Sequence, residues 1–303
     1  MLITFAYIER NSAIHRLDPR VKLVLLFAFS FSMYQTINLW VVLIGLIISA
    51  FYYSQAHLKW AETKRAWHLL ITLIAVLVGA NYILSGGNVV PTVDLAHQHV
   101  LYNLPFLGFK PRPPYIGVTP LPLSIENITF MFTQAMRNTS IALLAVPISY
   151  TTNPGHLGIA FNGLGVSDKI SYAIDLSLRF LPTLAREFSV TLDAQRARGF
   201  EIDKLRGGIF SKVARLAPMI VPVVIGSIVG AEDIISAMEL RCFGIGKRSW
   251  LTELHARPID RTIITLSLLG FAIITILNIL GYFFTQGPLH FLHTQGIPGF
   301  LVP

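Results

Sequence analysis

Charged residues are scarce in this chain. Asp, Glu, Lys and Arg make up 13% of its 303 residues, hydrophobic residues make up 53%, and none of the four charged types occurs after Arg261. The mean hydropathy is +0.60. An ordinary soluble domain is excluded, because about a quarter of the residues in such domains are charged. The composition therefore predicts an integral membrane protein.

Cysteine and catalytic motifs are also scarce. The single cysteine, Cys242, excludes an intramolecular disulfide. No Walker loop is recognisable, and neither is a pair of side chains that could act as nucleophile and general base. We therefore expect neither an enzyme nor a cofactor. The main alternative is a membrane-embedded enzyme acting on a lipid or polyprenyl substrate, but the apolar stretches hold almost no acid or histidine apart from His68 and Glu126. A self-contained permease would need polar groups at mid-membrane, where only Arg137 and scattered Ser, Thr and Asn occur.

Several apolar stretches are long enough to cross a hydrocarbon layer of roughly 30 Å as helix. Five candidates occur, at Val21–Tyr34, Leu39–Tyr53, Trp67–Leu84, Ile125–Tyr150 and Thr262–Phe284. The first two are short. Either residues 35–38 form a turn between two thin spans, or residues 21–53 form one overlong helix.

The placement of basic residues favours the turn. Fourteen Lys and Arg residues lie between Thr151 and Arg261, whereas the loop at residues 86–123 has two. Cytoplasmic loops carry the excess of Lys and Arg, so the N terminus is expected in the cytoplasm and the C terminus outside the cell membrane. Five crossings satisfy this arrangement. A single helix over residues 21–53 would place Lys59, Lys64 and Arg65 outside.

The predicted fold is an all-α, polytopic membrane bundle of about five transmembrane helices with long cytoplasmic coupling helices. We expect a bundle over residues 1–150 with an external loop at 86–123, a coupling region over 151–261, and a final span with an external tail over 262–303. The proline-rich run at 110–114 favours extended polyproline conformation in the loop. Residues 219–230 are apolar but reach only about 60% of a crossing, and they are predicted to pack against the bundle.

Two further groups of polar residues have alternative interpretations. Arg137 falls inside a predicted span, so it is expected to point into the bundle, where it either bonds backbone carbonyls or takes part in conformational coupling. Asp94, His97 and His99 have spacing compatible with a metal site, but such loops are usually polar surface, and we predict no metal. The basic residues that give the net charge of +8 flank apolar helices and do not form a separate basic domain. This placement indicates anionic lipid and protein partners and no nucleic acid.

A degenerate repeat lies within the predicted coupling region. Residues 194–204 match residues 237–247 at five of eleven positions when shifted by 43 residues, and the identities include Arg198 with Arg241. Each copy follows a helical pattern and is expected to break at a glycine, Gly199 or Gly244. Two similar helix ends that each present an arginine suit two similar docking sites. The simpler interpretation is a cation that is favourable near a helix C terminus.

The chain resembles the transmembrane T component of energy-coupling factor transporters, the EcfT/CbiQ family. The resemblance covers nearly the whole chain. It rests on five segments, namely His15–Leu23, Thr151–Pro154, Leu178–Pro182, the signature Ala197-Arg198-Gly199, and Leu240-Arg241-Cys242 at the place of a second Ala-Arg-Gly signature.

This resemblance implies a function and a set of partners. The chain would join two cytosolic ABC ATPase subunits to a small membrane substrate-binding subunit, for uptake of a vitamin or a transition-metal ion. The two signatures would contact the ATPase subunits. The second signature departs from the family pattern, since Leu240 replaces alanine and Cys242 replaces glycine. A left-handed Cys242 would be strained by about 1 kcal/mol, so termination at Gly244 is an alternative, and Arg198 is predicted to be the more sensitive arginine.

Overall fold

The structure is a computed structural model. It describes residues 7–10, 12–36, 38–84, 100–112, 115–199, 209–246, 250, 254 and 256–283. The described residues fall into two compact units, one formed by those within 8–152 and 255–303, the other by those within 1–7 and 153–254. We call the first the bundle and the second the coupling unit.

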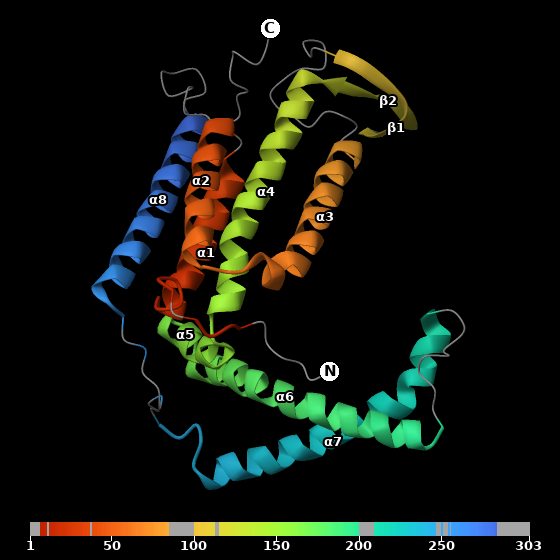
Figure 1. Ribbon diagram of the computed structural model, residues 1–303, viewed down its shortest axis with the longest axis vertical. Helices are drawn as coiled ribbons and strands as arrows, with labels where there is room; N and C mark the ends of the chain where they lie inside the picture. The colour runs from red at the N-terminus through yellow and green to blue at the C-terminus, as the bar shows by residue number, and fades with distance from the viewer. Residues whose placement is uncertain are drawn as a thin grey trace. The chain divides into compact units, whose positions relative to one another are not determined.

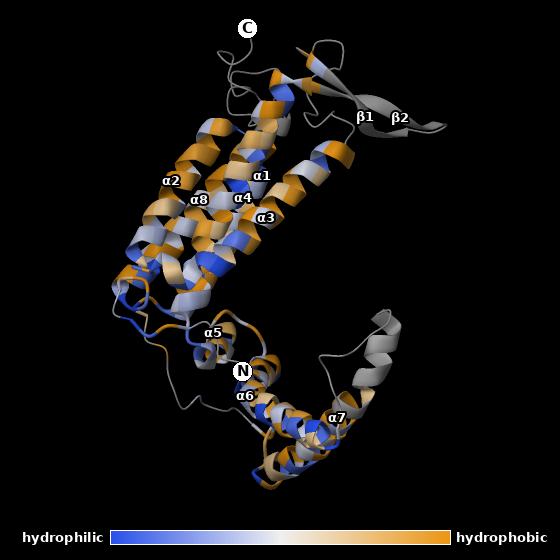
Figure 2. Ribbon diagram, turned by 45° about the vertical axis from the view of Figure 1, so that its right-hand side comes forward, coloured by the Kyte–Doolittle hydropathy of each residue, from blue (hydrophilic) through white to orange (hydrophobic). Residues whose placement is uncertain are grey.

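Five helices form the bundle (Figure 1). They are α1 (Pro19–Gln35), α2 (Leu39–Gln55), α3 (Trp60–Leu84), α4 (Ile125–Thr151) and α8 (Pro258–Phe283). Helix α4 packs against α1, α2 and α3, and α8 packs against α1. Many of their residues are hydrophobic, as the colours in Figure 2 show, and α8 has large exposed hydrophobic residues such as Leu266. The predicted all-α membrane bundle is confirmed.

The first two helices are separate, as predicted, because each has its own N-terminal cap. A carboxylate oxygen of Asp18 accepts a hydrogen bond from the Arg20 amide at 2.9 Å, and Pro19 starts α1. The side chain of Asn38 accepts from the Trp40 amide at 2.9 Å and starts α2. The chain therefore breaks between Gln35 and Leu39, and residues 21–53 do not form one overlong helix.

The loop before α4 differs from the expectation of polyproline structure. Strands β1 (Val100–Arg112) and β2 (Tyr115–Ser124) pair in antiparallel register, from Val100 opposite Ser124 to Arg112 opposite Tyr115. Proline is tolerated because each strand of a two-stranded ribbon has a free edge, where a missing N–H removes no ladder bond. One register irregularity, between Leu104 and Gly108, surrounds Pro105.

The coupling unit contains η2 (Pro154–His156), α5 (Leu157–Gly163), α6 (Asp168–Ala197) and α7 (Ile209–Leu240). Helix α6 packs against both α5 and α7. Gly158 allows the close approach of α5, since a Cβ there would lie 2.5 Å from the Asp175 Cβ. Asp175 is buried and pairs with Arg179, four residues later on the same helix, at 3.0 Å.

Helix α7 extends beyond the apolar segment at residues 219–230 on both sides. It continues through Pro218 and Pro222, and its segment Ile220–Leu240 is long and apolar enough to cross a membrane. By the same criterion α3 and Pro258–Ile279 of α8 also qualify, and α2 is a shorter apolar helix.

Candidate functional site

The first signature forms the C-terminal end of α6. Ala197 is the last helical residue, Arg198 is the C-cap, and Gly199 has a φ of +85°. The Gly199 amide donates to the Arg196 carbonyl at 2.9 Å, and the Arg198 amide donates to the Ala194 carbonyl at 3.3 Å. A left-handed glycine after the cap is a common way to satisfy the last carbonyls of a helix.

The second signature ends α7 with the same geometry. Leu240 is the last helical residue, and Cys242 has a φ of +52°. The Cys242 amide donates to the Glu239 carbonyl at 2.9 Å, and the Phe243 amide donates to the Met238 carbonyl at 3.0 Å. These two bonds form a Schellman motif, with Cys242 in the position that Gly199 holds in α6. Gly244 therefore does not terminate the helix, because the paired bonds compensate for the strain of a left-handed cysteine.

The two arginine-bearing ends lie at opposite ends of α6. Arg198 directly follows α6, whereas the ring of Phe243, just beyond α7, lies 4.6 Å from the ring of Tyr172 in the second turn of α6. At 1.5 Å per residue, about 40 Å of helix separates Tyr172 from Arg198. Arg198, Arg241 and Cys242 are exposed, and 86% of Leu240 is exposed. We call these two helix ends the signature ends.

The strain at Cys242 leads to a prediction. Cys242→Gly should stabilise the end of α7 by about 1 kcal/mol, because glycine adopts positive φ without a steric penalty. Hydrogen exchange of the Phe243 amide should slow by about fivefold. The matched variant Gly199→Cys should destabilise the end of α6 by a similar amount. Unchanged exchange in Cys242→Gly would show that the left-handed residue is not strained.

Arg137 lies on α4 within the bundle. Its Cζ atom is 5.1 Å from the centre of the Tyr34 ring on α1, a distance typical of a cation–π contact. The side chain is half-buried. The expected position inside the bundle is thus observed, with an aromatic ring as a contact.

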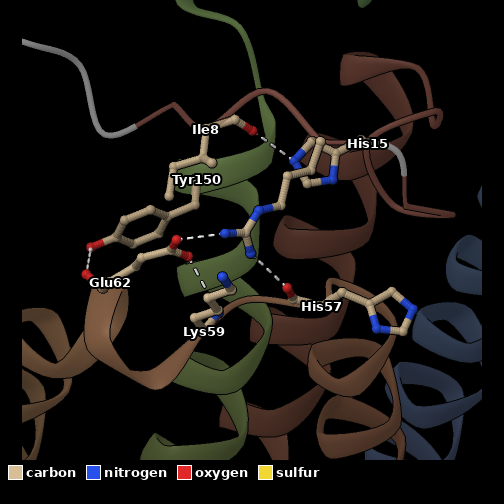
Figure 3. A network of polar contacts seen from close by, with 7 residues as sticks. Ile8, His15, His57, Lys59, Glu62 and Tyr150 are labelled. Atoms are coloured by element: carbon tan, nitrogen blue, oxygen red, sulfur yellow. Dashed lines mark hydrogen bonds and ion pairs between the residues drawn. The ribbon is translucent and has the colours of Figure 1, made fainter.

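A polar network at one end of the bundle joins three chain segments (Figure 3). Arg10 pairs with Glu62 of α3 and donates to the His57 carbonyl at 2.9 Å. The Ile8 amide donates to the Tyr150 carbonyl of α4 at 2.9 Å. None of these residues was singled out from the sequence, because the partners are 47 to 142 residues apart and no local pattern marks them.

His15 belongs to the same network and has a defined tautomer. Its Nε2 lies 2.9 Å from the Ile8 carbonyl, which can only accept, so Nε2 carries the proton. Its Nδ1 then accepts from the Ser12 hydroxyl at 2.7 Å. Burial lowers the pKa of His15, the charges of Lys22 and Arg10 act in the same direction, and the bond to Ile8 opposes them. The folded protein therefore favours the neutral ring.

This preference predicts a pH dependence of stability. A histidine with a lowered folded pKa contributes fully above its unfolded value of 6.5, and the contribution is lost as the pH falls through that value towards the folded pKa. The free energy of unfolding should therefore fall more between pH 7.5 and 5.5 in the wild type than in His15→Gln, which does not titrate. The control His57→Gln, at an exposed ring, should behave as the wild type. An equal fall in His15→Gln would contradict the prediction.

Lys22 forms a second contact that the sequence did not reveal. Its side chain is 1% exposed, and Nζ donates to the backbone carbonyl of Thr151 at 2.9 Å and to the Thr151 hydroxyl at 3.2 Å. Thr151 is the last residue of α4, so its carbonyl has no partner within the helix. Lys22 thus supplies a donor and a positive charge at a helix C terminus.

Asp94, His97 and His99 lie outside the described residues. Within the described part of the chain, no group of three or more His, Cys, Asp and Glu side chains is arranged to hold a metal ion.

Comparison with known proteins gives consistent matches. Residues 10–250 match the family described as CbiQ, cobalt transport protein. The chain is 27% identical to the energy-coupling factor transporter transmembrane protein EcfT of Bacillus selenitireducens, over 88% of this chain and 94% of that protein. It is 26% identical to EcfT of Lactococcus lactis, over 78% of this chain and 82% of that protein. A Bifidobacterium longum protein named as an ABC transporter ATP-binding protein is 26% identical over 79% of this chain, but the match spans 29% of that protein.

Proposed function

Because this chain belongs to the CbiQ cobalt transport protein family, we propose that it is the transmembrane scaffold of an energy-coupling factor importer. In this proposal it joins two cytosolic ABC ATPase subunits to a small substrate-binding membrane subunit, for uptake of a vitamin or a transition-metal ion. It transmits motion and does not itself hydrolyse ATP. The partial match to a protein named as ATP-binding supports an association with ABC ATPases.

The observation that carries the proposal is the pair of signature ends. Each presents an exposed arginine beside a left-handed residue, and in both ends the amide of that residue donates to the carbonyl three residues earlier. A guanidinium offers five donors in a rigid fork, which can bind carboxylates or helix C-terminal carbonyls in a groove. Two similar ends about 40 Å apart along one helix would fit grooves on two similar subunits.

Helix α6 provides a physical route for coupling. It has 30 residues and joins the two signature ends through its own C terminus and its contact with Phe243. A movement of one ATPase subunit relative to the other would therefore change the position or tilt of α6. In the proposal, this change reaches the substrate-binding subunit through the exposed apolar faces of α6 and α7, which include Ile170 of α6 and Ile225 of α7.

Affinity purification from native membranes tests the proposal. The tagged chain should copurify with two ABC ATPases and a small membrane protein. ATP hydrolysis should be found only in fractions that contain the ATPases. A sample freed of partners should show no turnover. Hydrolysis by the isolated chain, or purification without any ATPase, would contradict the proposal.

The topology belongs to the same proposal, with a cytoplasmic N terminus and an external C terminus. In a Cys242→Ser background, a membrane-impermeant thiol reagent should label cysteines placed at residues 86–123 from outside. A cysteine that replaces Lys59 should react with the reagent only after the membrane is permeabilised. External labelling at Lys59 would overturn the five-crossing arrangement.

A further inference from the structure

One face of α3 carries an open hollow of about 830 Å³. Its lining residues are Lys64, Arg65, His68, Leu69, Thr72, Leu73 and Val76. They recur at intervals of about four residues, so they form one stripe along the helix. The stripe is divided into a basic part nearer the start of α3 and an apolar part further along, a change of polarity also visible on α3 in Figure 2.

The basic part presents three nitrogen-bearing side chains within five residues. Lys64, Arg65 and His68 are all exposed. The His68 Nδ1 lies 2.8 Å from the Lys64 carbonyl and must donate to it, so Nε2 of the neutral ring can only accept a hydrogen bond. The nearby carboxylate of Glu62 pairs with Arg10. The charge of this part of the hollow is therefore positive.

The apolar part presents carbon almost exclusively. Leu69, Leu73 and Val76 are 66%, 47% and 60% exposed. The Thr72 hydroxyl donates to the His68 carbonyl at 2.8 Å, so its only donor is used within the helix. From Leu69 to Val76 the stripe rises about 11 Å, which fits within one leaflet of a hydrocarbon core about 30 Å thick.

We propose that this hollow binds one anionic phospholipid. The phosphate lies between Lys64 and Arg65, and an acyl chain lies along Leu69, Leu73 and Val76. The charge and the apolar stripe are matched only by a ligand that combines an anionic head with a hydrocarbon tail, placed at the depth where α3 enters the membrane. The inference requires that α3 crosses a membrane but not that the signature ends bind ATPases, so each proposal can fail without the other.

Native mass spectrometry of the purified, delipidated chain in neutral detergent tests the site. The probes are phosphatidylglycerol, phosphatidylcholine with the same acyl chains, and glycerol 1-phosphate as a free headgroup. We expect one phosphatidylglycerol per chain to bind at least fivefold more tightly than phosphatidylcholine. Glycerol 1-phosphate should not displace it, because the free headgroup lacks the tail.

Charge variants identify the position of the lipid. Lys64→Gln and Arg65→Gln should each weaken phosphatidylglycerol binding about fivefold, since each basic residue near a membrane surface contributes a comparable factor. The control Lys59→Gln removes one exposed charge five residues from Lys64 and should change binding less than twofold. All these side chains are exposed, so the variants should fold.

Several outcomes would overturn the inference. Equal binding of the two lipids would show that the basic part recognises no headgroup. Equal losses in Lys59→Gln and Lys64→Gln would indicate general surface charge. Displacement by glycerol 1-phosphate would indicate a small-anion site. Protection of Leu69 by a copurifying membrane protein, without bound lipid, would show that the face is a protein interface.

Discussion

The double variant Arg198→Ala/Arg241→Ala is expected to lose substrate uptake completely and to release the ATPase subunits. Removing one partner of a buried, charge-assisted contact weakens binding by about 2 to 5 kcal/mol. Two docking points on one scaffold reinforce each other, because binding at one raises the effective concentration at the other. Loss of both should therefore weaken ATPase binding more than loss of either one. Pull-down of the ATPase subunits and uptake in cells measure the two effects.

The single variants should each reduce uptake sharply, and Arg198→Ala should have the larger effect. In both signature ends the amide of a left-handed residue donates to the carbonyl three residues earlier. The left-handed conformation disfavours Cys242 by about 1 kcal/mol, whereas glycine adopts it without a steric penalty. The end of α7 is therefore expected to be less firmly ordered and to contribute less to docking.

Arg196 provides a matched control. It carries the same charge in the last turn of α6 and lies 3.5 Å from Asp193, but it projects from another face than Arg198. If arginine acts only as a favourable cation at a helix C terminus, Arg196→Ala and Arg198→Ala should have similar effects. If Arg198 docks, Arg196→Ala should retain uptake. Normal pull-down and uptake in the double variant, at unchanged expression, would show that the repeat is only a pair of similar helix ends.

Lys22→Met is expected to destabilise the bundle by about 2 kcal/mol, because it removes charge-assisted hydrogen bonds and leaves a buried carbonyl without a donor. Methionine preserves most of the side-chain volume and leaves no large cavity. The loss of stability therefore measures the contribution of the hydrogen bonds to Thr151. Thr151 ends α4 immediately before the chain enters the coupling unit, and Lys22 therefore stabilises the point of exit from the bundle. Denaturant unfolding of the purified protein in detergent measures the change.

Two variants separate the contributions. Thr151→Val removes the hydroxyl contact at 3.2 Å and retains the carbonyl contact at 2.9 Å, so it should have a smaller effect than Lys22→Met. Lys59→Met, at an exposed lysine, should change the free energy of unfolding by less than about 0.5 kcal/mol. Equal effects of Lys22→Met and Lys59→Met would mean that the buried contact contributes nothing.

Local signals in the sequence were sufficient for the helices of the bundle and for the repeat. Apolar runs of sufficient length predict membrane helices, and the caps at Asp18 and Asn38 act over two residues. The shift of 43 residues aligns Ala197 with Leu240, which are the last residues of α6 and α7. Helix ends are determined by neighbouring residues, so a repeat in sequence became a repeat in structure.

Other features were decided by the tertiary structure. The contact of Lys22 with Thr151 spans 129 residues, and that of Arg10 with Glu62 spans 52. The antiparallel pairing of β1 with β2 and the continuation of α7 through two prolines were likewise not predicted. In a membrane, apolar residues that face lipid and those that face another helix are alike in hydropathy, because lipid is as apolar as a helix interface. Hydropathy thus predicts that helices form, whereas packing decides which of them meet and which polar side chains are brought together.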